Sequence, residues 1–231
     1  MSLVKPLAKI YLYCRAIPKS ILFNFWYLPF PQAIRLPIVV SHRVRILRLS
    51  GKLDIPKSAK TGKIRFGFGQ VQVQVADSHR SRMLWSLGKS GKITLGERVK
   101  IGTGCKLFVD GALNIRARTN LTGESTIVCE KEVHIGESCL ISWQTIIMDT
   151  DFHPIFDTKQ DTRLNPNSSV TIGNNTWLGA RVTMNKGTSI GSNCVVATST
   201  HIHKPFNQDD IILGGNPARV IGSMKDKHFT D

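Results

Sequence analysis

The chain has 231 residues, of which 41% are hydrophobic and 7% aromatic. This length allows one large domain with a buried core, and the low aromatic content argues against a nucleic-acid binder that stacks bases. The formal net charge is +15. Residues 1–100 carry 19 Lys and Arg against 3 Asp and Glu, whereas residues 101–231 carry 12 against 13. The N-terminal part therefore predicts either an anionic partner or a solvated basic face.

Cysteine spacing and apolar runs exclude further classes. The five cysteines form no C-x-x-C pair, which argues against a zinc ribbon. The start has no secretory pattern, and no apolar run reaches about 18 residues. We therefore expect a cytoplasmic protein with reduced thiols and no single-helix membrane span.

Residues 1–50 form a basic and aromatic N-terminal segment. Several prolines, among them Pro18 and Pro29, are expected to divide it into short amphipathic helices. One hypothesis is that this segment docks on an anionic membrane face, giving a peripheral location at the inner membrane. The alternative is that it packs on the end of the fold or on a neighbouring subunit.

A six-residue repeat follows, after an alternating stretch from Ile64 to Val75 that predicts a strand. Short runs of this period begin at Leu95, Ile115 and Ile135. The clearest run has aliphatic or Met residues at Ile172, Leu178, Met184, Ile190, Val196 and Ile202. Because six is even, an extended chain turns the same face inward at each repeat. Glycines and asparagines between these positions are expected to allow sharp corners.

Two segments break the repeat. Residues 149–170 contain His153-Pro154 and many polar residues, and are expected to form an extruded loop, a common place for function. After Gly214-Gly215-Asn216-Pro217, residues 218–227 are expected to form a short cap.

The repeat of aliphatic, Gly, two variable, small and variable residues resembles that of the hexapeptide-repeat acyltransferases, and in particular the sugar and polysaccharide O-acetyltransferases. The resemblance covers about residues 60–222. It implies an all-β fold, a left-handed parallel β-helix, with a domain at 51–222 and a tail at 223–231. The small-residue positions include Cys105, Cys139 and Cys194, which are expected to be buried fillers.

The same resemblance implies an acetyl-CoA-dependent transfer to a sugar hydroxyl, with His153 as general base. Asp149, Asp151 and Asp157 lie near it in the sequence, and one of them is expected to orient the imidazole. Asp151 is our choice, although a backbone carbonyl is an alternative. In isolation, a loop histidine is more often an ordinary surface residue.

The segment Trp177-Leu178-Gly179-Ala180 resembles the family's Trp-Ile-Gly-small segment. The resemblance implies that Trp177 and Gly179 line the acetyl-CoA groove, and that the backbone N–H of Ala180 stabilises the thioester oxyanion. A tryptophan that only shields the coil is the structural alternative.

The segment from Thr198 to Lys204 resembles the family's Ala-Gly-Ser-x-Val-x-Lys segment, and Gly215–Ile221 resembles its terminal Gly-Asn-Pro-Ala motif. These imply that Thr198, Lys204 and Arg219 bind CoA, with Lys186 as a weaker candidate. The chain departs from the family pattern at Thr198-Ser199, which replace Ala-Gly, and in its additional histidines at 201 and 203.

Trp143 and Gln144 are expected to bind the sugar or glycan acceptor together with Asp149, because an indole and a polar amide suit a sugar face and its hydroxyls. Burial of Trp143 under a neighbouring subunit is the alternative. The resemblance also implies a homotrimer with three sites. From the residues themselves we expect no metal and no nucleic-acid partner.

Three other functions remain open. An N-acetyltransferase for an amino or nucleotide sugar would use the same base and groove. A γ-type carbonic anhydrase would need three zinc-binding histidines, but the only close pair is His201 and His203. A non-catalytic β-helix scaffold would need neither the histidine loop nor the terminal motif.

Overall fold

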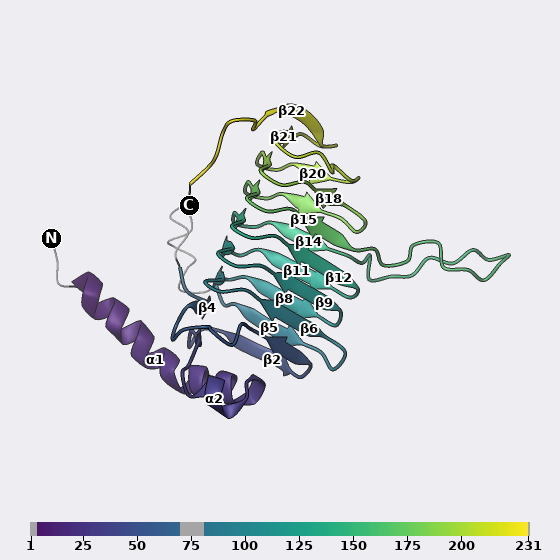
Figure 1. The fold of residues 1–231 in the computed structure, drawn as a ribbon. Helices are drawn as coiled ribbons and strands as arrows, with labels where there is room; N and C mark the ends of the chain where they lie inside the picture. Colours follow the sequence, from purple (N-terminus) through teal and green to yellow (C-terminus); the bar gives the residue numbers. More distant parts are fainter. Residues whose placement is uncertain (1–3, 70–80, 231) are drawn as a thin grey trace.

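The structure, a computed structural model, describes residues 4–69 and 81–230. Two helices, α1 (Val4–Tyr27) and α2 (Phe30–Ala33), lie at the base of a column of stacked strands (Figure 1). The expectation of several short helices before residue 28 is wrong, because α1 continues through Pro18. Proline removes one helical hydrogen bond, and the exposed position of Pro18 leaves its ring room in solvent.

Three sheets, all within the described residues, form the column, and their strands are parallel except for the last pair, β21 and β22. The nine-stranded sheet contains β1 (Ile38–Val40), β4 (Ile64–Phe66), β7 (Lys100–Thr103), β10 (Asn120–Gly123), β13 (Leu140–Ile141), β16 (Trp177–Leu178), β19 (Val195–Val196), β21 (Ile211–Gly214) and β22 (Arg219–Ser223). The seven-stranded sheet contains β2 (Arg45–Leu49), β5 (Leu84–Leu87), β8 (Lys106–Val109), β11 (Thr126–Cys129), β14 (Ile146–Met148), β17 (Thr183–Met184) and β20 (His201–Ile202). The six-stranded sheet contains β3 (Lys52–Asp54), β6 (Lys92–Leu95), β9 (Ala112–Ile115), β12 (Glu132–Ile135), β15 (Val170–Ile172) and β18 (Ser189–Ile190).

The chain visits the three sheets in turn, so each strand pairs with the strand one coil below it. Leu121 stands between Ile101 below and Ile141 above, and this ladder points into the column. The six predicted repeat positions from Ile172 to Ile202 are all at most 2% exposed. The predicted left-handed parallel β-helix, with its helical N-terminal segment, extruded loop and C-terminal cap, is confirmed.

The β-helix begins earlier than residue 51. Strand β1 pairs with β4, and β2 pairs with β5, so residues 38–49 already form the first coil. Ile38 and Val40 are fully buried there. Of the predicted strand from Ile64 to Val75, only Ile64–Phe66 is observed, and Val71–Val75 lie outside the described residues.

The glycines of the repeat serve close stacking of the coils. A Cβ on Gly173 would lie 2.5 Å from the Gly191 carbonyl carbon of the next coil, which no side chain tolerates. The corners themselves are turned by other residues, such as Asn175 and Asn193, both with φ of 51°. Asparagine adopts this left-handed conformation more easily than most residues.

Two features depart from the coil. Residues 149–169 leave it after β14 and return at β15, forming an arm that projects from the column (green in Figure 1). At the other end β22 folds back antiparallel on β21 and caps it. No helix in the part of the chain that the structure describes is long and apolar enough to span a membrane.

Candidate active site

Two edges of the seven-stranded sheet hold most of the predicted site residues, while Trp177 and Arg219 lie on the nine-stranded sheet. We call the corner before the strands of the seven-stranded sheet the turn edge (residues 142–145, 179–182 and 197–200), and the corner after them the arm edge (149–153, 185–187 and 203–205). Six residues separate Ala180 from Lys186, so the two edges are at most about 20 Å apart along the chain. Within one chain the predicted site is thus divided between two corners.

His153 lies on the arm edge, near the root of the arm. Its side chain is exposed, while its backbone is held at both groups: its N–H donates to the Asp151 carbonyl at 2.7 Å, and its carbonyl accepts from Asn165 Nδ2 at 2.9 Å. The backbone is therefore fixed while the imidazole stays accessible. This combination suits a general base, which must reach a substrate in a defined position.

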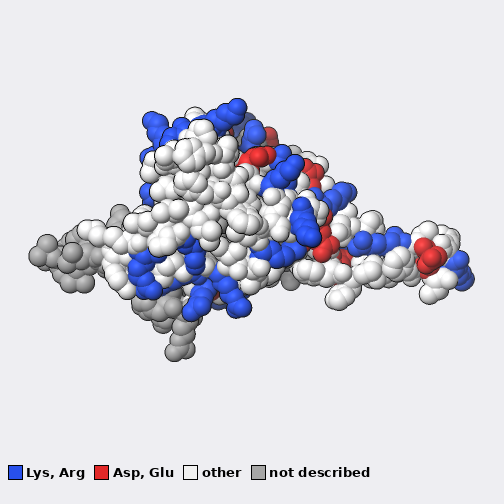
Figure 2. Space-filling view, turned by 90° about the horizontal axis from the view of Figure 1, so that it is seen from below, with Lys and Arg blue, Asp and Glu red and all other residues white. Residues whose placement is uncertain are grey.

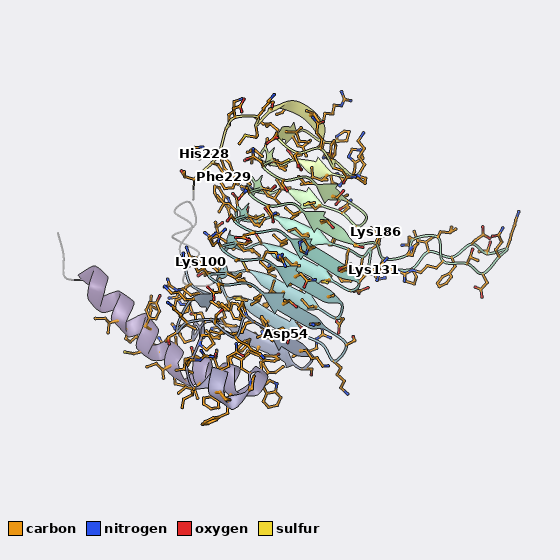
Figure 3. All side chains as sticks on the ribbon, viewed as in Figure 1. Asp54, Lys100, Lys131, Lys186, His228 and Phe229 are labelled. Atoms are coloured by element: carbon orange, nitrogen blue, oxygen red, sulfur yellow. The ribbon has the colours of Figure 1, made fainter. Side chains whose placement is uncertain are left out.

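Asp151 is engaged by other groups. Lys186 Nζ lies 2.5 Å from its Oδ2, and Asn165 Nδ2 donates to the same oxygen at 2.9 Å. These hydrogen bonds, with that of Lys186 the stronger effect, hold the pKa of Asp151 below its usual value. Figure 3 shows Lys186 at the root of the arm. Asp151 and Lys186, predicted for catalysis and CoA binding, form an ion pair that fixes the arm beside His153.

Asp149 has a structural role that the sequence did not predict. It occupies the inward-facing position of Cys129 in the coil below, and it is fully buried. Its carboxylate accepts the backbone N–H groups of Glu130, Lys131 and Glu132 at 2.7–2.8 Å. The predicted contact between Asp149 and the substrate is at odds with this geometry, because three backbone donors already surround the buried carboxylate.

Both legs of the arm are tied to the coil below through Glu130. Thr150 Oγ1 and Asn167 Nδ2 each donate to Glu130 Oε2 at 2.8 Å. Ser168 N also donates to the Asp149 carbonyl at 3.0 Å. Polar contacts therefore hold the two ends of the arm together at its root, and the outer part of the arm projects from the column.

The coils above the arm continue the polar character of this edge. Asn185 Nδ2 lies 2.9 Å from His201 Nε2, and the rings of His201 and His203 are 6.3 Å apart. Lys204 is exposed, and its ammonium lies 5.6 Å from the centre of the Phe206 ring. The arm edge thus stacks His153, the Lys186 ion pair and Lys204 in successive coils.

The turn edge offers backbone groups. Ala180 is 5% exposed and precedes Arg181, which has a φ of 60°. Its carbonyl accepts from Ser199 N at 2.8 Å, while its N–H donates no hydrogen bond within the described residues. A backbone donor without an acceptor at a tight turn is suited to hold an oxygen that develops negative charge.

Side chains at and beside the turn edge contact one another. Arg181 Nε donates to Gln144 Oε1 at 2.9 Å, so Gln144 is part of the corner, beside the partly buried Trp143. Trp177, on the outer face of β16, donates from Nε1 to Ser142 Oγ at 3.0 Å. Its ring is 37% exposed and lies 6.1 Å from that of Phe229.

The remaining predicted groups divide between the edges. Thr198 is exposed on the turn edge, one coil above Ala180, and Gly179 lets these coils approach, since a Cβ there would lie 2.8 Å from Thr198 N. Arg219 is exposed at the start of β22, near the top of the column. The sequence missed Asn165 and Asn185, although asparagines inside a polar loop and at a corner are a weak signal for such contacts.

Among the described residues, no three His, Cys, Asp or Glu side chains gather as metal ligands would. The predicted fillers Cys105, Cys139 and Cys194 are buried. Burial raises the pKa of the Cys105 thiol to about 12 and that of Cys139 to about 11. They are structural thiols, since a reactive cysteine needs an accessible thiolate.

Residues 169–200 match the family described as the hexapeptide repeat of succinyl-transferase. The chain is 39% identical over 88 residues to a polysialic acid O-acetyltransferase of Neisseria meningitidis, covering 38% of this chain and 41% of the relative. It is 31% identical over 118 residues to galactoside O-acetyltransferase of Escherichia coli K12, covering 50% and 55%. The aligned part thus spans about half or less of these two relatives.

Solved structures agree in fold. The polySia-specific acetyltransferase NeuO has a TM-score of 0.57 at 19% identity over 84% of both chains. The polysialic acid O-acetyltransferase OatWY has a TM-score of 0.51 at 24% identity, over 78% of this chain and 87% of that one. The matched repeat and the coil agree with these similarities: the chain has a hexapeptide repeat and a β-helix fold similar to those of the named sugar O-acetyltransferases.

Proposed function

We propose that the protein is an acetyl-CoA-dependent O-acetyltransferase that acts on a sugar hydroxyl of a glycan or glycolipid. One observation carries this proposal: a backbone-fixed, exposed His153 lies on one edge of a sheet, and an Ala180 N–H that donates no hydrogen bond within the described residues lies on the other. Acyl transfer to a hydroxyl needs a base for the proton and a donor for the oxygen that becomes negative. The similarity to named sugar O-acetyltransferases supports a sugar as acceptor.

In the proposed reaction, the imidazole of His153 takes the proton of the acceptor hydroxyl as the oxygen attacks the thioester carbonyl. The N–H of Ala180 donates to the carbonyl oxygen as negative charge develops there. Acetyl-CoA supplies the acetyl group, and the thiol of CoA leaves. We assign Thr198, Lys204 and Arg219 to the CoA moiety, since they are exposed and two of them are cationic. Trp143 and Gln144 are assigned to the sugar.

The proposal requires a homotrimer, because one chain holds the base and the oxyanion donor on different edges. In a ring of three copies, the arm edge of one subunit faces the turn edge of the next, so each site takes groups from two chains. The exposed apolar residues of the arm support such packing: Phe152, Ile155, Phe156 and Leu164 are 51–60% exposed. Location in the cytoplasm remains a prediction.

The first test measures release of the CoA thiol with a panel of neutral, acidic and amino sugars as acceptors. We expect turnover with a hydroxyl acceptor, and a fall of about 10²–10⁴ in kcat for His153→Ala. His228→Ala, on the exposed C-terminal tail, is the matched control and should keep its rate.

Three other outcomes of this test would change the proposed function. Turnover confined to amino acceptors, with an amide product, would replace O-acetylation by N-acetylation. Turnover that survives His153→Ala would remove His153 as the base. If the protein showed neither turnover nor CoA binding, the alternative of a non-catalytic β-helix scaffold would be favoured.

A further inference from the structure

Helix α1 has two apolar faces. One face is buried against the first coil: Ala16 and Phe23 are fully buried, and the Phe23 ring lies 4.9 Å from that of Trp85. Asn24 strengthens this contact, since its Nδ2 donates to the Ile38 carbonyl at 2.7 Å and its Oδ1 accepts from Ile38 N at 3.2 Å. The helix is therefore fixed rigidly to the base of the column.

The opposite face is apolar and exposed to solvent. Its side chains, together with those of α2 and the residue that follows it, are 43–67% exposed: Ile10, Ile17, Ile21, Leu22, Phe25, Trp26, Phe30 and Ile34. Steps of seven and four residues from Ile10 to Phe25 place them along one side of the helix. We call this surface the base stripe. A contiguous apolar surface of this kind marks a contact site more often than scattered exposed residues do.

Cations line one flank of the base stripe. A pocket of about 620 Å³ lies between α1 and β2, lined by Arg15, Lys19, His42, Arg43, Val44, Arg45, Ile46 and Arg82. Lys19 Nζ donates to the carbonyls of His42 and Val44 at 2.9 and 2.6 Å, which holds its charge at the pocket wall. We call this site the base pocket.

The charges of the base pocket favour an anion. Among the described residues, its lining includes five Lys and Arg and no Asp or Glu. Burial, followed by the nearby Arg15, Arg43 and Lys19, lowers the pKa of His42, as expected where the potential is positive. Figure 2, which views the molecule from below, shows an extended white surface with blue side chains gathered along its border.

We propose that the base of the column is a docking surface for an anionic phospholipid membrane. The base stripe enters the boundary between headgroups and acyl chains, and the base pocket holds a lipid phosphate. An apolar helix face with cations on its flank is the pattern of an interfacial helix. An apolar groove of about 520 Å³, lined in part by Leu36 and Val39, adjoins Ile10 and Ile17 of the base stripe and extends its apolar surface.

A second copy of the chain is a less suitable occupant. A symmetric pair joined through the base stripe would bring the two base pockets, each rich in arginine, to the same interface. Like charges that meet in this way oppose association, whereas an anionic lipid surface compensates them. The docked orientation leaves the arm at a distance from the membrane (Figure 1), so docking is separate from the proposed chemistry.

The test compares flotation of the full chain with vesicles of phosphatidylcholine alone and with vesicles that contain equal parts of phosphatidylglycerol. We expect binding to the anionic vesicles only, weakened by salt. A basic residue near an anionic surface contributes roughly fivefold in affinity, so Arg45→Glu with Arg82→Glu should lower partitioning at least about 25-fold. Both side chains are exposed. Lys225→Glu with Lys227→Glu, an equal charge change near the C-terminus, is the matched control and should have little effect.

A second pair tests the base stripe. Ile21→Ser with Phe25→Ser should lower partitioning at least about tenfold, because two inserted apolar side chains are lost. Turnover of a soluble acceptor should not change in Arg45→Glu with Arg82→Glu or in Ile21→Ser with Phe25→Ser. This readout separates failure of docking from failure of the acyltransferase proposal. Absence of vesicle binding, or equal losses in the test pair and the control pair of cations, would overturn the proposal. The proposal would also be overturned if the base stripe were buried between copies of the chain. In that case sedimentation would show a lower assembly mass for Ile21→Ser with Phe25→Ser than for the native chain.

Discussion

The turn edge and the arm edge lie at opposite ends of the same strands, yet they present different chemical groups. On the turn edge, tight corners with left-handed residues such as Gln144 and Arg181 expose backbone groups. On the arm edge, a 21-residue excursion from 149 to 169 carries titratable side chains and is fastened by an ion pair. The groups of the turn edge therefore belong to the regular coil, whereas His153 lies where the chain leaves it.

The largest expected effect concerns the turn edge. Ala180→Pro removes the N–H while keeping the corner, because proline is favoured before a residue of positive φ in a type II turn. We expect kcat to fall about 10²–10³-fold, the cost of losing one oxyanion donor.

Ala117→Pro is the matched control. Ala117 also precedes a left-handed residue, Arg118 with φ of 59°, and its N–H likewise donates no hydrogen bond within the described residues. Because Ala117 lies at another corner, we expect the kcat of Ala117→Pro to equal that of the native chain. A rate unchanged by Ala180→Pro, in a folded protein, would remove the turn edge from the chemistry.

The second prediction tests whether the turn edge and the arm edge of one site come from different chains. Co-expression of His153→Ala with Ala180→Pro should restore about one quarter of the native activity. In a trimer that combines the edges of neighbouring chains, random mixing leaves one site in four with both groups intact. The measurement is thiol release by the purified mixed assemblies. If both groups of a site came from one chain, the mixture would be as inactive as its parents.

The third prediction concerns stability at the root of the arm. Asp149→Ala leaves three buried backbone N–H groups without their acceptor, and we expect the free energy of unfolding to fall by about 3 kcal/mol. Asp110→Ala removes a half-exposed ion pair with Arg48 and should cost less than about 1 kcal/mol. Urea unfolding measures both changes. Equal losses would mean that Asp149 does not hold the root.

The smallest effects are opposite responses to pH. The lowered pKa of Asp151 means that its contribution at the arm edge is present above the unfolded value and is lost as pH falls below about 4. The raised pKa of Cys105, about 12, means that its contribution is complete below the unfolded value of about 8.5. This contribution is lost as pH rises towards 12.

Acid should therefore expose the arm to pepsin before the column unfolds, and Asp151→Asn should reduce this pH dependence. Alkali should lower the melting temperature, less so in Cys105→Ser relative to its own value at neutral pH. A column that melts at the same temperature from neutral pH to pH 11 would contradict the assignment to Cys105.

The sequence predicted the regular parts of the molecule well. The positions from Ile172 to Ile202 are inward-facing, and both the arm and the cap lie where the repeat stops. Prediction from the sequence was wrong or incomplete where the six-residue repeat is absent. Strands β1 and β2 carry no six-residue signal of their own, and α1 continues through Pro18 although a proline predicts a break. The predicted contact of Asp149 with the substrate does not fit its burial against backbone donors of the coil below, which only stacking brings to it.

By itself the sequence determined the coil, its corners and the arm, because an even period of six acts locally on which side chains face inward. Only the tertiary structure decided which polar groups meet. Lys186 reaches Asp151 and Asp149 reaches residues 130–132 through stacking of coils whose partners are 17 to 35 positions apart in the sequence. Stacking also placed His153 and the Ala180 N–H on different edges, because strand and corner lengths, summed along the chain, set which residues stand above one another.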